Sequence, residues 1–104
     1  VHIDSIVALS EITGPLRGGS HRILLQPPDG SIGHWVAQCG RDYFDSMGIG
    51  PPRRLGRLRY NRVQMQATRA EYCGVWCLLW LYCKQRHRME LLSSYRNLDV
   101  VDEV

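Results

Sequence analysis

One cysteine of the chain lies where a thiol would be chemically active. Cys73 begins an apolar stretch that we expect to form a helix. The unpaired N–H groups and the dipole at a helix N-terminus favour negative charge, and hence the thiolate that attacks carbonyl carbon. Gly74 would let a substrate backbone come close, and the amide of Gln66 could point at a developing oxyanion. The alternative is a cysteine that packs as a small hydrophobic residue, which describes Cys77 and Cys83 well.

A histidine and an aspartate could provide the base for such a thiol. Alternating residues on both sides of a turn at residues 39–41 predict a β-hairpin. Whichever two turn residues are central, His34 and Asp45 lie on one face of the hairpin, directly opposite or diagonal, within about 8 Å at Cβ. A carboxylate in that position fixes the tautomer of the imidazole and stabilises its charged form. Taken alone, the pair is explained equally by a structural histidine.

The rest of the pattern describes the elements that must hold these side chains. Apolar residues nearly all round predict a helix through the core from residue 73. We expect one α+β domain over residues 1–104, a small antiparallel or mixed β-sheet packed on a central buried helix. Its predicted parts are a helix and turn over 1–21 (the helix over 1–12), a sheet region over 22–72 with strands at 22–26, 32–38, 42–46 and 62–66, the central helix over 73–96, and an acidic tail over 97–104.

The four cysteines do not form a recognisable disulfide or metal framework. No export signal accompanies them, so the disulfides of a secreted protein are not expected. The spacing from Cys73 to His87 looks like a ligand set, but on one helix these positions spread over about 21 Å. Zinc holds its ligands within about 2.3 Å of one point. We therefore expect no metal and no cofactor.

Positive charge gathers in two short stretches of a chain whose formal net charge is +3. Such clusters bind polyanions, and they also occur as solvated surfaces beside an acidic segment. The longest uncharged apolar run, residues 72–83, is 12 residues long, whereas a membrane span needs about 20, so we expect no membrane contact. The candidate nucleic-acid contacts lie in the first stretch: Arg53, Arg54, Arg57 and Arg59.

Taken together, these stretches resemble the adenovirus-protease and ubiquitin-like-protein-protease group of cysteine proteases, including the adenain-like proteins of adenovirus-like DNA viruses and related mobile elements. In that group a His-Trp pair opens a strand, and an acidic residue follows on the next strand, often within Tyr-Phe-Asp-Ser. A glutamine lies about seven residues before a Cys-Gly that begins the central helix. The matching residues, within roughly residues 33–85, are His34-Trp35, Tyr43-Phe44-Asp45-Ser46, Gln66 and Cys73-Gly74.

The resemblance implies a papain-like cysteine protease that works by acyl transfer. Cys73 would be the nucleophile, His34 the general base, and Asp45 the residue that orients the histidine. Trp35 would shield this pair from solvent or shape the substrate groove. The remaining roles are an oxyanion donor, with Gln66 preferred to Gln64, and a close approach of substrate at Gly74.

The same resemblance implies substrates and partners. We expect an endopeptidase that cleaves after small residues, Gly in particular, in the maturation of a viral polyprotein or of capsid proteins. One alternative is an isopeptidase acting on ubiquitin or a ubiquitin-like protein, and another is an inactive protease-like domain that binds nucleic acid or a partner protein. Adenovirus-type members of the group are activated by a short peptide and by DNA, which the arginine cluster would suit. The expected location is the host cytoplasm or nucleus, or the virion, and not the exterior of the cell.

A glycine pair near the N-terminus has two interpretations. Residues 16–20, Leu-Arg-Gly-Gly-Ser, resemble the sequences that this group cleaves and the tail of ubiquitin. Gly19-Ser20 is then a hypothetical self-cleavage site. The same residues also suit a glycine turn between two elements.

Overall fold

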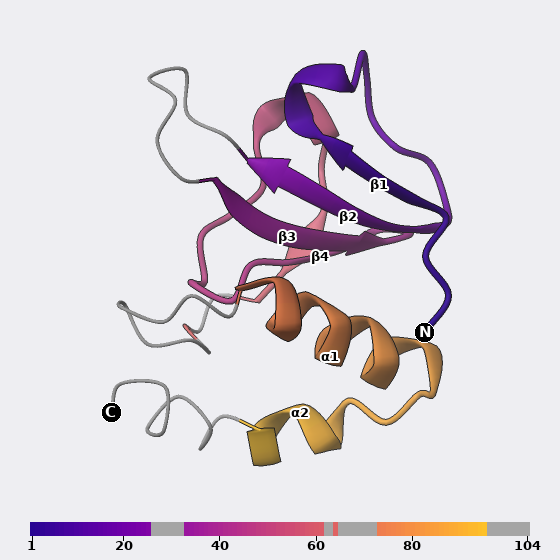
Figure 1. Ribbon diagram of the computed structural model, residues 1–104, viewed down its shortest axis with the longest axis vertical. Helices are drawn as coiled ribbons and strands as arrows, with labels where there is room; N and C mark the ends of the chain where they lie inside the picture. The colour runs from indigo at the N-terminus through magenta and orange to yellow at the C-terminus, as the bar shows by residue number, and fades with distance from the viewer. Residues whose placement is uncertain (26–32, 62–63, 65–72, 96–104) are drawn as a thin grey trace.

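The computed structural model describes residues 1–25, 33–61, 64 and 73–95. Figure 1 shows a sheet with α1 (Cys73–Gln85) across one face and α2 (Glu90–Tyr95) on the far side of α1. The strands are β1 (Ser5–Ala8), β2 (Ser20–Leu25), β3 (His34–Cys39), β4 (Asp42–Phe44) and β5 (Arg59–Tyr60), and two single 3-10 turns are η1 (Leu9–Glu11) and η2 (Arg53–Leu55).

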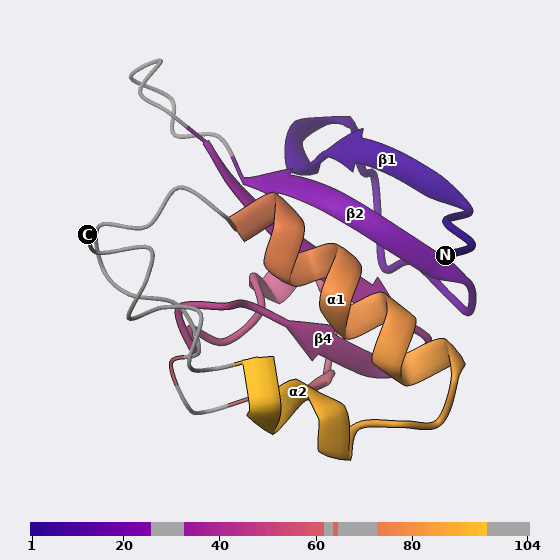
Figure 2. The same cartoon turned by 60° about the horizontal axis from the view of Figure 1, so that its bottom comes forward.

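The five described strands form one mixed sheet in the order β1-β2-β3-β4-β5. β2, β3 and β4 are antiparallel neighbours, whereas β1 pairs with β2 and β4 with β5 in parallel. α1 packs against β3, the middle strand, and Figure 2 shows α1 lying across the sheet between β2 and β4. The predicted α+β fold, with a mixed sheet packed on a helix, is confirmed. Within the residues that the structure describes, no helix is long and apolar enough to cross a membrane.

Each face of the sheet has its own hydrophobic core, because successive strand residues point to opposite sides. Val36 and Tyr43 lie on one face, and their neighbours Ala37 and Phe44 lie on the face that carries α1. The α1 core contains Ala37, Phe44, Trp76, Cys77, Trp80, Leu81, Cys83 and Leu92. The opposite core contains Ile12, Ile23, Val36, Tyr43 and Leu55.

The helix predicted over residues 1–12 is wrong. Residues 5–8 form β1, which pairs in parallel with residues 21–24 of β2. Ser5 Oγ also donates to Nδ1 of His21 at 2.6 Å, so the two strands are joined through side chains as well. β-branched residues in β1 suit a strand, and the long-range pairing outweighs the helical spacing.

The helix predicted over residues 73–96 is also wrong in its length, because α1 ends at Gln85 and α2 begins at Glu90. His87 has a left-handed φ of +54°. The N–H groups of His87 and Arg88 donate to the carbonyls of Lys84 and Cys83, at 3.3 and 2.8 Å. These two bonds form a Schellman motif, which ends a helix and usually places glycine at the left-handed position. Without glycine or proline, the sequence carried no sign of this end.

The expectation that the central helix is buried all round is corrected as well. α1 exposes a stripe of Val75, Leu78 and Tyr82. These positions are three and four residues apart, which is the spacing of one helix face. α1 therefore lies on the sheet as an outer layer and buries the face that carries Trp76 and Trp80.

Asp42 links β4 to β5 and to α1, and it provides the first prediction. Nε of Arg59 donates to its Oδ1 at 2.7 Å, and Nζ of Lys84 contacts its Oδ2. Burial by itself would raise the pKa of Asp42, but Lys84 and Arg59 outweigh it and hold the pKa below its ordinary value of 3.8. A carboxylate with a depressed folded-state pKa stabilises the fold above its unfolded pKa, and this contribution is lost as the pH falls through the folded pKa.

Replacing Asp42 with Asn is therefore expected to lower the free energy of unfolding by about 1 kcal/mol at pH 7. The difference from wild type should shrink towards zero below about pH 3. Urea unfolding of both proteins at the two pH values measures it. An equal difference at both would mean that the charge of Asp42 does not matter.

Candidate active site

His34 and Asp45 form a close pair at one end of the central hairpin. Cys39 pairs with Asp42 across a two-residue turn whose first residue, Gly40, has a φ of +58°. This is the register that makes the His34–Asp45 pair diagonal. Nε2 of His34 donates to Oδ1 of Asp45 at 2.6 Å. Because an ionised carboxylate can only accept, Nδ1 of the neutral imidazole keeps its lone pair and can act as a base.

The carboxylate is buried and held from several sides. The side chain of Asp45 is 3% exposed, and that of His34 is 28% exposed. Oδ1 of Asp45 also accepts from the N–H of Met47 at 2.8 Å. Asn61 brackets the backbone of Asp45, accepting from its N–H at 3.0 Å and donating to its carbonyl at 2.5 Å. No sequence pattern marks Asn61, whereas Asp followed by Ser-Met-Gly is a turn signal that could have indicated the Met47 bond.

Cys73 is the first residue of α1, and it lies half-buried beside the start of β3. The backbone N–H of Trp35 donates to Sγ of Cys73 at 3.4 Å. The sulfur therefore lies next to the peptide bond that joins His34 to Trp35, since that N–H belongs to this bond. The described part of β4 ends with Phe44 opposite Ala37, so it does not run alongside the beginning of β3.

The other three thiols have different surroundings. Burial raises the pKa of Cys77; Cys73 and Asp45 raise it further, while Arg22 lowers it. Burial also raises the pKa of Cys83. Cys39 is half-buried and accepts a bond from Ser20 Oγ at 3.7 Å. All four thiols are free, but Cys77 and Cys83 are held in the protonated, unreactive form at neutral pH.

Two predicted substrate contacts have other surroundings in the fold. A Cβ on Gly74 would lie 2.9 Å from Nη2 of Arg22 and 3.5 Å from Cδ1 of Trp35. The protein's own side chains thus fill the space that we expected a substrate to use. The Trp35 ring packs against the α1 core, on the face of the sheet opposite to that of His34, so it supports the start of α1 and does not cover the His34–Asp45 pair.

The predicted oxyanion donor, Gln66, lies outside the described residues, and so does most of the strand predicted over 62–66. Gln64, the second choice, is exposed. The assignment of an oxyanion donor therefore stays a prediction. The described strand in this region is β5, which was not predicted from the sequence.

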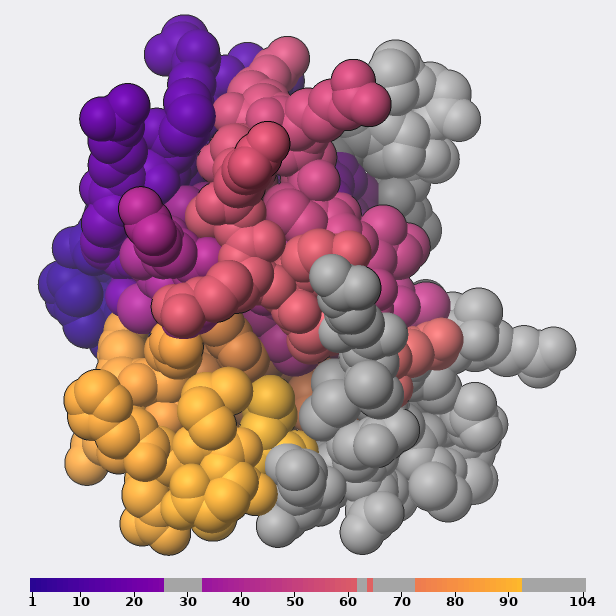
Figure 3. All heavy atoms as spheres, turned by 180° about the vertical axis from the view of Figure 1, so that it is seen from behind, coloured from indigo at the N-terminus to yellow at the C-terminus, as the bar shows by residue number. Residues whose placement is uncertain are grey.

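The arginine cluster is divided between several roles. Nη1 of Arg54 donates to the carbonyl of Leu9 at 3.0 Å, and Arg59 pairs with Asp42. Arg53 and Arg57 are exposed. Figure 3 shows that the segment after β4, magenta to pink, runs through the upper centre of the side away from the viewer of Figure 1, beside the indigo-to-purple N-terminal segment. Nucleic-acid contact through these residues stays a prediction.

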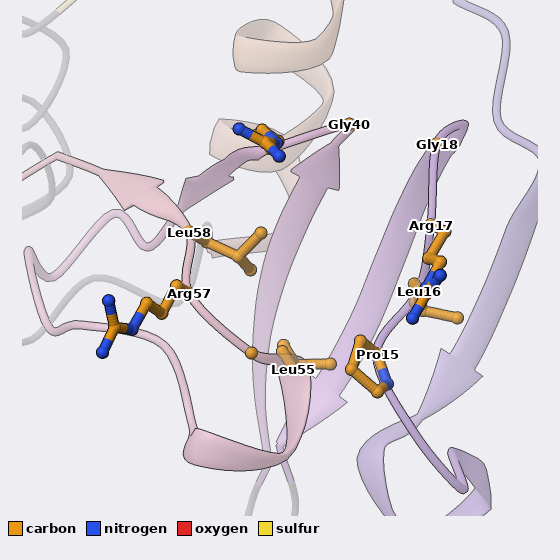
Figure 4. Close-up of a pocket in the computed structure, with 10 residues that line it drawn as sticks. Pro15, Leu16, Arg17, Gly18, Gly40, Leu55, Arg57 and Leu58 are labelled. Atoms are coloured by element: carbon orange, nitrogen blue, oxygen red, sulfur yellow. The ribbon is translucent and has the colours of Figure 1, made fainter.

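A hollow of about 540 Å³ adjoins this cluster (Figure 4). It lies between the segment before β2, the turn after β3 and the loop after η2. Leucines form much of its wall, and three arginines surround it. Its lining residues are Pro15, Leu16, Arg17, Gly18, Gly40, Arg41, Leu55, Gly56, Arg57 and Leu58.

The glycine pair before β2 forms a tight turn. Gly18 and Gly19 have φ of +68° and +74°. The carbonyl of Gly19 accepts from the N–H of Gly40 at 2.9 Å, and the N–H of Ser20 donates to Oδ2 of Asp4 at 2.7 Å. The strand register places Ser20 at the opposite end of β2 from His34, about 17 Å away. These contacts match the turn interpretation, and in this fold the Gly19-Ser20 bond does not lie at the proposed site.

Three elements thus bring the His34–Asp45 pair and the Cys73 thiol to the beginning of β3, where the sulfur accepts from the N–H of the residue that follows His34. A base with a free nitrogen and a thiol at a helix N-terminus are the groups that nucleophilic chemistry at a carbonyl carbon requires. The buried carboxylate would stabilise the imidazolium that such chemistry forms. Comparison of the chain with models of known protein families, with curated protein sequences and with solved structures finds no match.

Proposed function

We propose that this protein is a cysteine peptidase of papain-like type, similar to the adenovirus-protease and ubiquitin-like-protein-protease group. One observation carries the proposal. Asp45 follows β4, His34 opens β3 and Cys73 opens α1, yet contacts of 2.6 and 3.4 Å connect them through the backbone of Trp35. A half-buried thiol at a helix N-terminus thus lies against the backbone of the residue next to the proposed base, which supports the proposal.

In the proposed mechanism, Nδ1 of His34 takes the thiol proton of Cys73. The thiolate attacks the carbonyl carbon of the substrate, and the carbonyl oxygen becomes an oxyanion. The C–N bond then breaks as His34 returns the proton to the leaving amine, which leaves a thioester on Cys73. Water loses a proton to His34 and hydrolyses the thioester, which releases the acid and restores the thiol.

The proposed substrates are polypeptides cleaved after small residues, with a viral polyprotein or capsid protein first and a ubiquitin-like protein second. The support for this choice is the sequence resemblance around His34, Asp45 and Cys73. DNA or a short activating peptide is the proposed partner, and the host cell or the virion is the proposed location. The competing proposal is an inactive domain of the same fold that binds nucleic acid or protein.

The test is alkylation at neutral pH with a Gly-Gly vinyl sulfone, followed by peptide mapping. Cys73 is expected to react selectively, and His34→Ala is expected to slow its reaction about 100-fold, since the base is lost. His2→Ala is the matched control, because His2 is exposed and its side chain pairs with Asp4, at the other end of the chain from the proposed nucleophile. Slow and equal labelling of the four cysteines, with or without DNA, would favour the inactive binding domain.

A further inference from the structure

Arg22 has an unusual position for a cation. It lies on β2, and its guanidinium stacks over the ring of Trp35, 4.5 Å from the centroid. Its Nε is buried and has no hydrogen-bond partner among the described residues. A buried donor without an acceptor costs free energy, and a charged one costs more.

The guanidinium also lies against the first turn of α1. Its Nη2 would be 2.9 Å from a Cβ on Gly74, the residue that follows Cys73. A helix N-terminus carries partial positive charge from its unpaired N–H groups. A second positive charge there is unfavourable unless an anion lies close to both.

No acidic side chain in the described ranges is available as that anion, because each one has another partner. Those of Asp42 and Asp45 bind Arg59, Lys84 and His34. The others are Asp4, bound to His2 and Ser20, Glu11, bound to the N–H of Ala8, and Glu90, bound to Arg88.

Cys73 directly precedes Gly74, so its thiol is a group that can become an anion at the same first turn of α1 as the guanidinium. We propose that Arg22 is the counter-ion of the Cys73 thiolate, a positioning residue that stabilises the negative charge formed when His34 takes the thiol proton. This inference rests on the proposed function, because it requires a thiolate at Cys73. The surroundings of Cys77, one turn along α1, agree with it. Cys73 raises the pKa of that thiol and Arg22 lowers it, so both groups lie close enough to act on the same sulfur.

A purely structural Arg22 would make a different contribution. A planar side chain on Trp35 fills space whether or not it is charged. A counter-ion acts through its charge, so it should favour anionic reagents over neutral ones at the same sulfur. The ratio of the Cys73 alkylation rates with iodoacetate and with iodoacetamide separates the two roles, because both reagents have nearly the same size.

Arg22→Gln is expected to lower this ratio about three- to tenfold at low salt, and Arg22→Lys to restore most of it. The difference should shrink at high salt, since screening weakens the interaction. Arg86→Gln is the matched control. Arg86 stacks over Tyr82 near the opposite end of α1, 5.3 Å from the ring centroid, so this variant removes the same charge and the same type of stacking far from Cys73.

Gly74→Ala is a second variant that leaves the charge in the protein. Its new methyl group would occupy the position against Nη2 of Arg22 and would push the flexible end of that side chain away. Alanine favours a helix more than glycine does, so loss of folding is not expected. The ratio should fall as it does in Arg22→Gln.

The outcomes distinguish this inference from the proposed function. If Cys73 of the wild type reacts no faster than in His34→Ala, no thiolate forms there and both are overturned. If the reaction depends on His34 but the ratio is the same in wild type, Arg22→Gln and Gly74→Ala, the proposed function stands and the role of Arg22 is overturned.

Discussion

Replacing Asp45 with Asn is expected to slow the alkylation of Cys73 by iodoacetamide about 10- to 100-fold at neutral pH. The carboxylate stabilises the imidazolium that His34 becomes when it takes the thiol proton. A charge-assisted hydrogen bond at 2.6 Å to a carboxylate that is 3% exposed is strong, since little water screens it. A loss of about 1.4–2.8 kcal/mol of imidazolium stabilisation lowers the thiolate fraction 10- to 100-fold, which gives the expected range.

The substitution is nearly isosteric, which makes the cause of the effect clear. An amide oxygen at this position can still accept from the N–H of Met47 and from Nε2 of His34. The bonds between Asn61 and the backbone of residue 45 do not involve the changed side chain. The slower alkylation would therefore come from the loss of the negative charge and of tautomer control at His34, while the hairpin stays in place.

Asp42→Asn is the matched control for this measurement. It makes the same chemical change on the same hairpin, but Asp42 pairs with Arg59 and Lys84, away from the proposed site. Its Cys73 alkylation rate should stay within about twofold of wild type, since stability changes of about 1 kcal/mol leave the folded state dominant. Equal rates for wild type and Asp45→Asn would show that His34 works without its carboxylate, and the proposed triad would be reduced to a dyad.

The part of the site that the sequence could predict is the part built from local signals. Alternating residues and a glycine in the turn are enough to place His34 and Asp45 on one face, because both possible registers give that result. The start of the helix at Cys73 is equally local. The structure adds the contact of 3.4 Å between Sγ and the N–H of Trp35, which depends on packing between α1 and β3.

Long-range pairing explains what the sequence could not predict. β1 has spacing that suits a helix, and it is a strand because Ser5 to Ala8 pair with a strand further along the chain. β5 is too short to show a period, and it forms by parallel pairing with β4. Arg22 and Asn61 contribute to the site from β2 and from the end of β5, where no motif marks them. The pairing that brings them in is set by the whole sheet.

The core under the site leads to the second large prediction, that Trp80→Ala lowers the free energy of unfolding by about 3–5 kcal/mol. The side chain of Trp80 is 5% exposed, and its ring stacks on Phe44 with centroids 5.6 Å apart. Removing it leaves a cavity between α1 and β4, and the surrounding rings cannot close it completely. A domain of this size has about 5–15 kcal/mol of stability in total, so much of it would be lost. Urea unfolding measures the change.

This loss should also be visible at the thiols. Phe44 directly precedes Asp45, and Cys77 and Cys83 belong to the same core as Trp80. As the core opens, the buried cysteines become accessible, so alkylation of Trp80→Ala should spread from Cys73 to the other thiols. Tyr82→Ala is the control, since Tyr82 lies on the same helix but is 39% exposed, and it should cost less than about 1 kcal/mol and keep the selectivity for Cys73. If Trp80→Ala kept that selectivity and its stability, the stack of Trp80 on Phe44 would not be what holds the hairpin and its carboxylate against α1.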